Sequence, residues 1–168
     1  LPGGRAQSVD FPTERAEASP QARGDAMLVS QILKGKGREV LTAGPEDALS
    51  EIARRLESER VGALLVVEGG QVAGIISERD IVAALARSGA AALDAPARSY
   101  MTADVIRAKP TETVDELLAR MTDRRVRHLP VLDGETLCGL VSIGDLVKHK
   151  ISEVEAEAQG LKAYIAAG

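Results

Sequence analysis

Apolar residues recur along the chain at two spacings, and each spacing predicts one kind of element. Over 48–56 and 117–121 they stand three and four positions apart, which is typical of a helix with one buried face. Shorter apolar stretches at 39–42 and 105–108 precede these helical segments. Continuous apolar runs of strand length form two pairs, and a glycine-containing turn separates the members of each pair, as in a β-hairpin. The runs are 63–67 with 72–77 and 129–132 with 136–142.

A second helix is expected after each hairpin. These helices open near Asp80 and Asp145 and run through Leu85 and through Lys148. The order strand, helix, strand, strand, helix therefore occurs two times. Apolar strands with helices between them indicate a sheet that is covered on at least one face, so the expected fold class is α/β.

An internal duplication explains the repeated order. Shifting the sequence by 65 positions aligns three motifs: V-x-x-A-x-P, R-V-x-x-L-x-V and a run that reads GIISERDIV in one copy and GLVSIGDLV in the other. The motifs occupy 40–45, 60–66 and 74–82 in the first copy and 105–110, 125–131 and 139–147 in the second. Of the 45 positions from 40 to 84, 14 are identical without a gap, whereas chance gives about three.

The chain is expected to divide into four segments. Residues 1–26 mix Gly, Pro, Ser and charge without a period, which is typical of a disordered tail or an added remnant. The first repeat is placed at 27–90 and the second at 91–150. Residues 151–168 continue the last helix as an amphipathic C-terminal helix, with apolar residues at steps of three and four. Because the repeats have their own cores, we expect this stripe to meet a second subunit in a homodimer.

Composition narrows the classes of function. The 168 residues carry a formal charge of −4 and only 2% aromatic residues, which disfavours binding of nucleic acid through phosphates or stacked bases. The single cysteine, Cys138, cannot form an intramolecular disulfide, and with two histidines it completes no zinc-type ligand set. No apolar run approaches the roughly 20 residues that span a bilayer. We therefore expect a cytoplasmic protein that requires no metal and binds neither nucleic acid nor membrane.

A repeated G-h-h-S-x-x-D element, in which h is apolar, carries the candidate chemistry. It places a hydroxyl and a carboxylate three residues apart where a strand leads into a helix, as Ser77 with Asp80 and Ser142 with Asp145. Free backbone N–H groups and the positive helix end at such a turn suit a phosphate, and an aspartate can accept both hydrogen bonds of a ribose diol. The alternative is that these residues only cap the helix, which is their commonest role.

This element, with the preceding strands RVGALLV and RVRHLPV, resembles a tandem pair of cystathionine-β-synthase (CBS) domains. The resemblance covers about Met27 to Lys150 and is similar in layout to stand-alone bacterial CBS-pair proteins. It implies two pseudo-symmetric β-α-β-β-α repeats packed through their sheets, usually dimerising into a flat disc. It also implies two clefts that bind adenosyl ligands such as AMP, ADP, ATP, NAD or S-adenosylmethionine.

In such pairs each cleft combines the serine and aspartate of one repeat with the first strand and hairpin of the other. The resemblance implies that the aspartates hold ribose hydroxyls, that the serines hold phosphate, and that apolar and backbone groups enclose adenine. Cleft A is expected to contain Ser77, Arg79, Asp80, Val105, Arg127, His128 and Pro130. Cleft B is expected to contain Lys34, Lys36, Val40, Val61, Gly62, Ala63, Ser142 and Asp145.

The two clefts are expected to differ in charge. Arg127 offers cleft A a bidentate phosphate donor, whereas cleft B has Gly62 at the equivalent position and more room. Lys34, Lys36 and Arg38 could supply the phosphate donors of cleft B, or they could stand in a solvated loop. The residues leave both interpretations open.

The sequence favours a sensor over an enzyme. It contains no clustered Ser, His and Asp set, no P-loop, no G-x-G-x-x-G before a helix and no metal motif. The expected function is non-catalytic regulation through adenine nucleotides, with AMP, ADP, ATP or NAD reporting energy or redox state. A ligand that bridges two repeats would shift conformation or assembly, and an unidentified regulated protein would respond. The alternative is a ligand-free module for dimerisation or protein docking.

Overall fold

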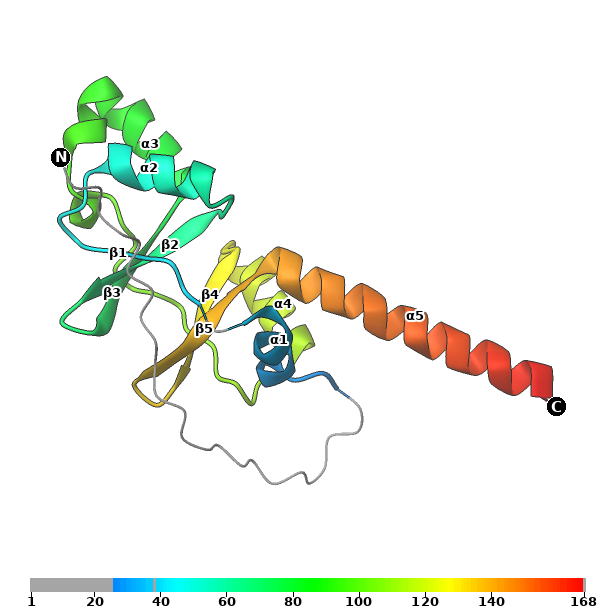
Figure 1. Cartoon of the computed structure of the whole chain (residues 1–168). Coiled ribbons are helices and arrows are strands. Elements are labelled where there is room, and N and C mark those ends of the chain that lie inside the picture. Colours follow the sequence, from blue (N-terminus) through cyan, green and yellow to red (C-terminus); the bar gives the residue numbers. More distant parts are fainter. Residues whose placement is uncertain (1–25, 38, 168) are drawn as a thin grey trace. The chain divides into compact units, whose positions relative to one another are not determined.

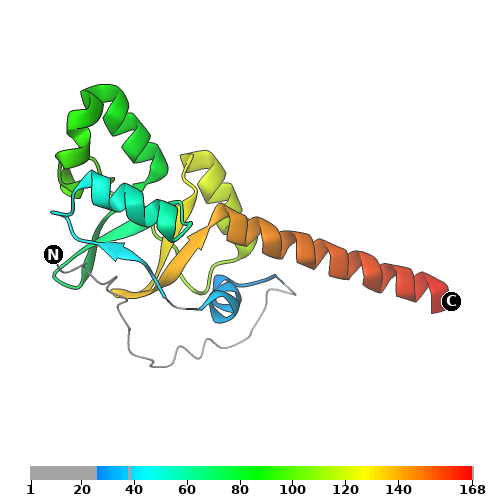
Figure 2. The ribbon, with the colours of Figure 1, turned by 45° about the horizontal axis from the view of Figure 1, so that its top comes forward.

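The computed structural model describes residues 26–37 and 39–167, so the expected tail at 1–26 lies outside the described residues except for Ala26. The described residues form two compact units. Unit 1 comprises 39–107 and 134–137, and unit 2 comprises 26–37, 108–133 and 138–167. Figures 1 and 2 show the elements of both units in two views.

Unit 1 is built on a three-stranded sheet. Its central strand β2 (Ala63–Glu68) pairs in parallel with β1 (Thr42–Ala43) and antiparallel with β3 (Gln71–Ser77). The helical elements are α2 (Leu49–Ser58), α3 (Glu78–Ser88) and the 3-10 helices η1 (Gly89–Asp94) and η2 (Ala97–Ser99). Helix α2 buries Leu49, Ile52 and Leu56 in a core that also contains Leu64 and Val66 of β2. Burial of each such side chain stabilises the fold by about 1.5–3 kcal/mol.

Unit 2 has the same order around a second hairpin. Strand β4 (His128–Asp133) pairs with β5 (Thr136–Ser142), and Ala108 forms a parallel bridge with Val131. This bridge stands 65 positions after the β1–β2 pair Ala43 and Val66. The helices are α1 (Val29–Lys36), α4 (Val114–Arg124) and α5 (Ile143–Ala167).

The α/β fold class and the repeated element order are confirmed. The correspondence extends to the backbone, because Arg60 and Arg125, which are 65 positions apart, both have positive φ angles, 54° and 53°. Two details differ from the expectation. The first strand of the second repeat is reduced to the single bridge at Ala108, and residues 29–36, for which no helix is expected from the sequence, form α1.

A short segment ahead of the strand, helix, strand, strand, helix order of each repeat packs in the unit of the other repeat. We call these the first lead segment (27–37) and the second lead segment (95–102). In unit 2, the backbone N–H of Val114 donates to Met27 O at 3.0 Å. In unit 1, the N–H of Leu49, 65 positions earlier, donates to Ala95 O at the same distance. The first lead segment therefore brings α1 and its lysines to the repeat that carries Ser142.

Two repeat-equivalent glycines make room for these segments. A Cβ atom on Gly139 would lie 2.6 Å from Leu33 Cδ2, and one on Gly74 would lie 2.6 Å from Met101 Sδ and 3.0 Å from Thr102 O. Glycine at the first position of each G-h-h-S-x-x-D element thus leaves room for the lead segments, and at Gly74 a Cβ atom would also press on a backbone oxygen.

Candidate functional site

Ser77 and Asp80 form a reciprocal cap between β3 and α3, which we call the Ser77 turn. The N–H and the hydroxyl of Ser77 both donate to Asp80 Oδ2 at 2.7 Å, and the N–H of Asp80 donates back to Ser77 Oγ at 3.4 Å. Ser77 has the extended backbone of an N-cap residue. The local sequence explains this geometry, since a strand ending in Ser three positions before Asp satisfies the first N–H groups of the helix.

The Ser142 turn, formed by Ser142 and Asp145 at the start of α5, has the same geometry. The N–H and the hydroxyl of Ser142 donate to Asp145 Oδ2 at 2.8 and 3.0 Å, and the N–H of Asp145 donates to Ser142 Oγ at 3.2 Å. The capping role is therefore shown for both pairs. It does not use the whole carboxylate, because within the described residues neither Asp80 nor Asp145 has a hydrogen bond to Oδ1.

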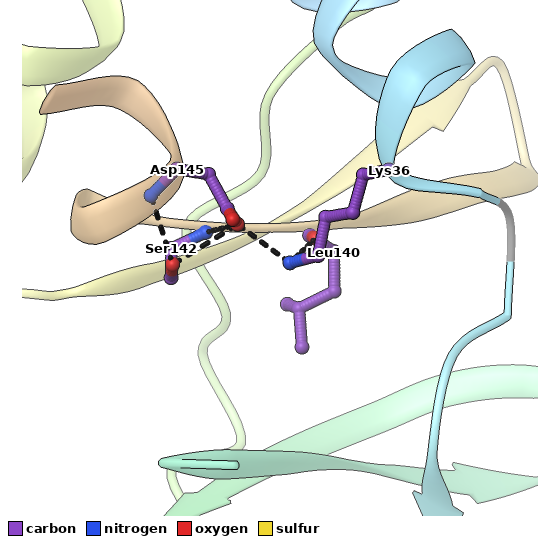
Figure 3. Close-up of polar contacts among 4 residues, drawn as sticks. All are labelled: Lys36, Leu140, Ser142 and Asp145. Carbon is purple, nitrogen blue, oxygen red and sulfur yellow. Dashed lines mark hydrogen bonds and ion pairs between the residues drawn. The ribbon is translucent and has the colours of Figure 1, made fainter. Parts of the chain in front are cut away.

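Lys36 distinguishes the Ser142 turn from the Ser77 turn. Its ammonium, at the end of α1, lies 2.5 Å from Asp145 Oδ2 and donates to Leu140 O at 3.2 Å, as Figure 3 shows. The pair is partly open to solvent, with 42% of the Lys36 side chain and 24% of the Asp145 side chain exposed. The solvated-loop interpretation therefore does not hold for Lys36, which comes to the predicted carboxylate across 109 positions of sequence.

The pKa of Asp145 reflects this environment. Burial acts to raise the pKa, but the hydrogen bonds from Lys36 and from the Ser142 N–H, together with the charge of the ammonium, outweigh burial and hold the pKa below its ordinary value. Asp145 is thus a carboxylate at neutral pH, as an acceptor for hydroxyl groups must be.

The other lysine of α1 is placed differently. Lys34 is exposed in the last turn of α1, and in the described part of the chain it makes no hydrogen bond or ion pair. Arg38 lies outside the described residues. Of the three basic residues considered for cleft B, the structure thus brings Lys36 to the Ser142 turn.

The start of each hairpin lies at the serine turn of its own unit. In unit 1, Glu78 N donates to Gly62 O at 3.1 Å, and Ala63 is in register with Ser77. In unit 2, Ile143 N donates to Arg127 O at 2.9 Å.

The remaining predicted residues divide between the two units. Of the cleft A set, Arg79 and Val105 lie in unit 1 with the Ser77 turn, whereas Arg127, His128 and Pro130 lie in unit 2. Of the cleft B set, Val40, Val61, Gly62 and Ala63 lie in unit 1, whereas Lys34 and Lys36 lie in unit 2 with the Ser142 turn. Val40, Ala63 and Pro130 are buried, and Arg79 and Arg127 are exposed. The grouping of residues from both units into each cleft stays a prediction.

Two features are absent from the described part of the chain. Residues 26–37 and 39–167 contain no cluster of three or more His, Cys, Asp or Glu that could hold a metal ion. Within the same ranges, no helix is both long and apolar enough to cross a membrane. Sequence reasoning missed the carbonyl of Leu140 as a partner of Lys36, since a backbone acceptor leaves no signal in the sequence.

Comparisons with known families, sequences and structures all find CBS-domain proteins. The family model described as CBS domain matches residues 29–87 and 97–152. The "CBS domain-containing protein CBSX3, mitochondrial" of Arabidopsis thaliana is 32% identical over 168 residues, which cover 92% of this chain and 82% of that protein. A CBS-domain containing protein of Agrobacterium tumefaciens, of known crystal structure, is 41% identical with a TM-score of 0.72, over 74% of this chain and 99% of its own.

A further similar structure contains ligands. The CBS domain pair of protein MJ0100, solved in complex with 5′-methylthioadenosine and S-adenosyl-L-methionine, is 27% identical to this chain. The TM-score is 0.68, and the match covers 76% of this chain and 98% of that one. Both ligands of that protein contain adenosine.

Proposed function

Since the chain belongs to the CBS domain family, with two matched repeats, we propose that it is a non-catalytic regulatory protein that binds adenine nucleotides at the Ser77 turn and the Ser142 turn. The observation that carries the proposal is the shared geometry of these turns. In each, a partly exposed aspartate at a helix start is held through Oδ2. The adenosine-containing ligands of the similar MJ0100 pair support the same class of ligand.

The chemistry of each turn suits a nucleotide. With Oδ2 fixed by the serine, Oδ1 can accept hydrogen bonds from a ribose diol without a change of the aspartate rotamer. The helix start on the same turn carries a partial positive charge, which suits an anionic phosphate. A phosphate that accepts from the serine hydroxyl would replace the hydrogen bond from that hydroxyl to the aspartate. Binding and not catalysis is proposed because the family model that matches both repeats is the CBS domain.

AMP is the ligand we propose first, with ADP, ATP and NAD as longer candidates. The Ser142 turn already has a cation beside it, because the Lys36 ammonium pairs with Asp145. When ribose hydroxyls bind the Asp145 carboxylate, Lys36 can move from Asp145 to a phosphate. Arg127, assigned to cleft A from the sequence, is proposed as the phosphate donor there. The other residues grouped into clefts A and B complete the proposed sites.

The signal is proposed to be a shift in conformation or assembly. A nucleotide can shift the equilibrium between two conformations, or two assembly states, only if it binds them with different affinities. The proposal therefore requires two states in which the Ser77 turn or the Ser142 turn differs in affinity for the nucleotide. We propose that the functional form is a homodimer and that a regulated protein, not yet identified, responds to the shift. The second candidate, a ligand-free docking module, is favoured by the observation that both serine–aspartate pairs are complete helix caps.

Calorimetric titration with adenosine, AMP, ATP and NAD separates the two candidates. Asp80→Ala and Asp145→Ala should each remove one site, with a loss of affinity of about tenfold or more, because hydrogen bonds to a charged group are lost. Each variant also loses a helix cap, so the matched control is Glu116→Ala, which removes the capping partner of Thr113 at the start of α4. The control should lose comparable stability and bind normally. Wild-type protein that takes up none of the four ligands at millimolar concentration would leave the docking module as the function.

A further inference from the structure

From Val147 onward, helix α5 has an apolar face that the described residues leave largely exposed. Helix α5 packs on α4 and α1 through its first turns, where Leu146 is fully buried. Figures 1 and 2 show its C-terminal half extending past both of these helices. Ile151 is 54% exposed and Leu161 63% exposed. Because helices in proteins depend on packing of an apolar face for most of their stability, this face requires a partner.

The apolar face follows a heptad pattern. From Val147 onward its residues are spaced by four, three, four, three and four positions, which assigns the a and d positions of a coiled coil without ambiguity. The a positions are Ile151, Ala158 and Ile165, and the d positions are Val147, Val154 and Leu161. The stripe is about 27 Å long, from a rise of about 1.5 Å per residue. In parallel coiled coils, isoleucine at a with leucine at d favours two strands, and Ile151, Ile165 and Leu161 follow this preference.

We propose that α5 pairs with α5 of a second copy of this chain as a parallel, in-register, two-stranded coiled coil. This inference specifies the homodimer of the proposed function but does not depend on nucleotide binding. The charges beside the stripe support it. In a parallel pair, each g position faces the e position of the following heptad on the other helix. Lys150 then faces Glu155 of the partner subunit, and Glu157 faces Lys162 of the partner subunit, so both pairs are attractive.

The antiparallel arrangement reverses the sign of these contacts. There g faces g and e faces e, and full overlap of the two stripes sets Val147 opposite Ile165. Glu155 then meets Glu155 of the partner subunit, and Glu157 meets Glu157 of the partner subunit. Lys148 would likewise meet Lys162 of the partner subunit. The charge pattern is therefore complementary in the parallel orientation and repulsive in the antiparallel one.

The pair of Glu157 with Lys162 gives the clearest test of whether the two helices are parallel or antiparallel. Lys150 is already held in its own chain, with its ammonium 3.0 Å from Asp115 Oδ1 and 2.8 Å from Glu153 Oε2. Lys162 has no charged residue three or four positions away on α5. Its replacement therefore changes no charge pair within the helix.

Lys162→Glu gives opposite results for the two orientations. In the parallel dimer it removes two attractions and adds two repulsions. At about twofold for each of these four changes, the dissociation constant of the dimer should rise about 15-fold. In the antiparallel dimer it would instead relieve the repulsion from Lys148 and lower the constant. Sedimentation equilibrium measures the dissociation constant, and circular dichroism checks that helix content is unchanged. Glu157→Lys combined with Lys162→Glu should restore wild-type affinity in the parallel dimer.

Cysteine cross-linking tests the register directly. Ile165→Cys places two thiols side by side in a parallel, in-register pair, whereas the antiparallel pair holds them about 27 Å apart along the axis. Ala163→Cys, on the outer face, is the matched control and should cross-link little, and wild-type protein gives the background from Cys138. A wild-type monomer at about 100 micromolar, tighter dimerisation of Lys162→Glu, or no disulfide for Ile165→Cys would each overturn the proposal. Nucleotide titrations of the same variants report separately on the proposed function.

Discussion

Replacing Lys36 by methionine isolates the ion pair on the Ser142 turn. Methionine keeps the aliphatic stem and the helix propensity of lysine, but it removes the ammonium that donates to Asp145 Oδ2 and Leu140 O. Exposed ion pairs contribute about 0.2–1 kcal/mol, and hydrogen bonds to charged groups about 1.5–3 kcal/mol. Since this pair is partly exposed, we expect Lys36→Met to lower the free energy of unfolding by about 1 kcal/mol at pH 7.

Lys34→Met is the matched control. Both lysines lie in the last turn of α1 and interact favourably with the negative end of that helix. Only Lys36 reaches the Ser142 turn, so the difference between the two variants measures the pair with Asp145. Repeating Lys36→Met in an Asp145→Asn background completes a double-mutant cycle, in which the effect of the substitution should largely disappear.

The contribution of the pair should also follow the protonation of Asp145. Because folding lowers the pKa of this carboxyl, its stabilisation is complete above the unfolded pKa of about 3.9 and is lost as pH falls through the lower folded pKa. The stability difference between wild type and Lys36→Met should be constant from about pH 7 to pH 5 and should shrink below about pH 4. Urea unfolding followed by circular dichroism measures it. An equal loss for Lys34→Met, or a Lys36→Met loss that persists in Asp145→Asn, would refute the ion pair.

Three further predictions test unit 1, unit 2 and cleft A. Gly74→Ala should destabilise the protein by about 1–3 kcal/mol in urea unfolding, because the added Cβ would lie 3.0 Å from Thr102 O, a backbone atom that cannot easily move. Gly35→Ala is the control in α1: nothing lies within 4 Å of its added Cβ, so this substitution should stabilise the protein. Burial acts to raise the pKa of Glu112, but hydrogen bonds from Arg120 and from the Lys109 N–H, with the charge of Arg120, hold the pKa below its ordinary value. In the same assay, Glu112→Gln should lower the free energy of unfolding at pH 7, and the loss should shrink toward about pH 3, which is about one pH unit below the ordinary pKa of a glutamate. Arg127→Ala, studied by calorimetry in the Asp145→Ala background, should weaken AMP about tenfold and scarcely affect adenosine; equal weakening of both would contradict a role in holding phosphate.

The local parts of the fold could be predicted from the sequence, and so could the serine–aspartate turns. Strand and helix periods act over a few residues, and a cap joins positions three apart, so the pattern around Ser77 and Ser142 contains the necessary information. The position of α1 could not be predicted in this way. The first lead segment precedes one repeat and packs in the unit of the other, and no short-range pattern encodes such a contact.

A weaker signal for the lead segments exists at a different offset. Leu33 and Met101 occupy the same place over repeat-equivalent glycines, but they are 68 positions apart, whereas the glycines are 65 apart. A search at the single offset of 65 therefore aligns the repeats and misses the segments ahead of them. Because the repeat alignment does not include the first lead segment, the sequence offered Lys34 and Lys36 as equal candidates. It could not show that Lys36 reaches Asp145 or that Lys34 does not.

The proposed nucleotide site at the Ser142 turn and the proposed dimer contact lie on one helix, α5. Ser142 and Asp145 cap the start of α5, and the first a position of the proposed coiled coil, Ile151, is six residues or about 9 Å farther along the same helix. The Ser77 turn caps α3 instead, which ends at Ser88. A nucleotide bound at the proposed Ser142 site would contact the helix that is proposed to meet the partner subunit. If the nucleotide binds monomer and dimer with different affinities, dimerisation must change nucleotide affinity by the same factor by which the nucleotide changes dimerisation. The dissociation constant of the dimer should therefore respond to AMP in Asp80→Ala and lose that response in Asp145→Ala; the opposite pattern would mean that the coupling does not run through α5.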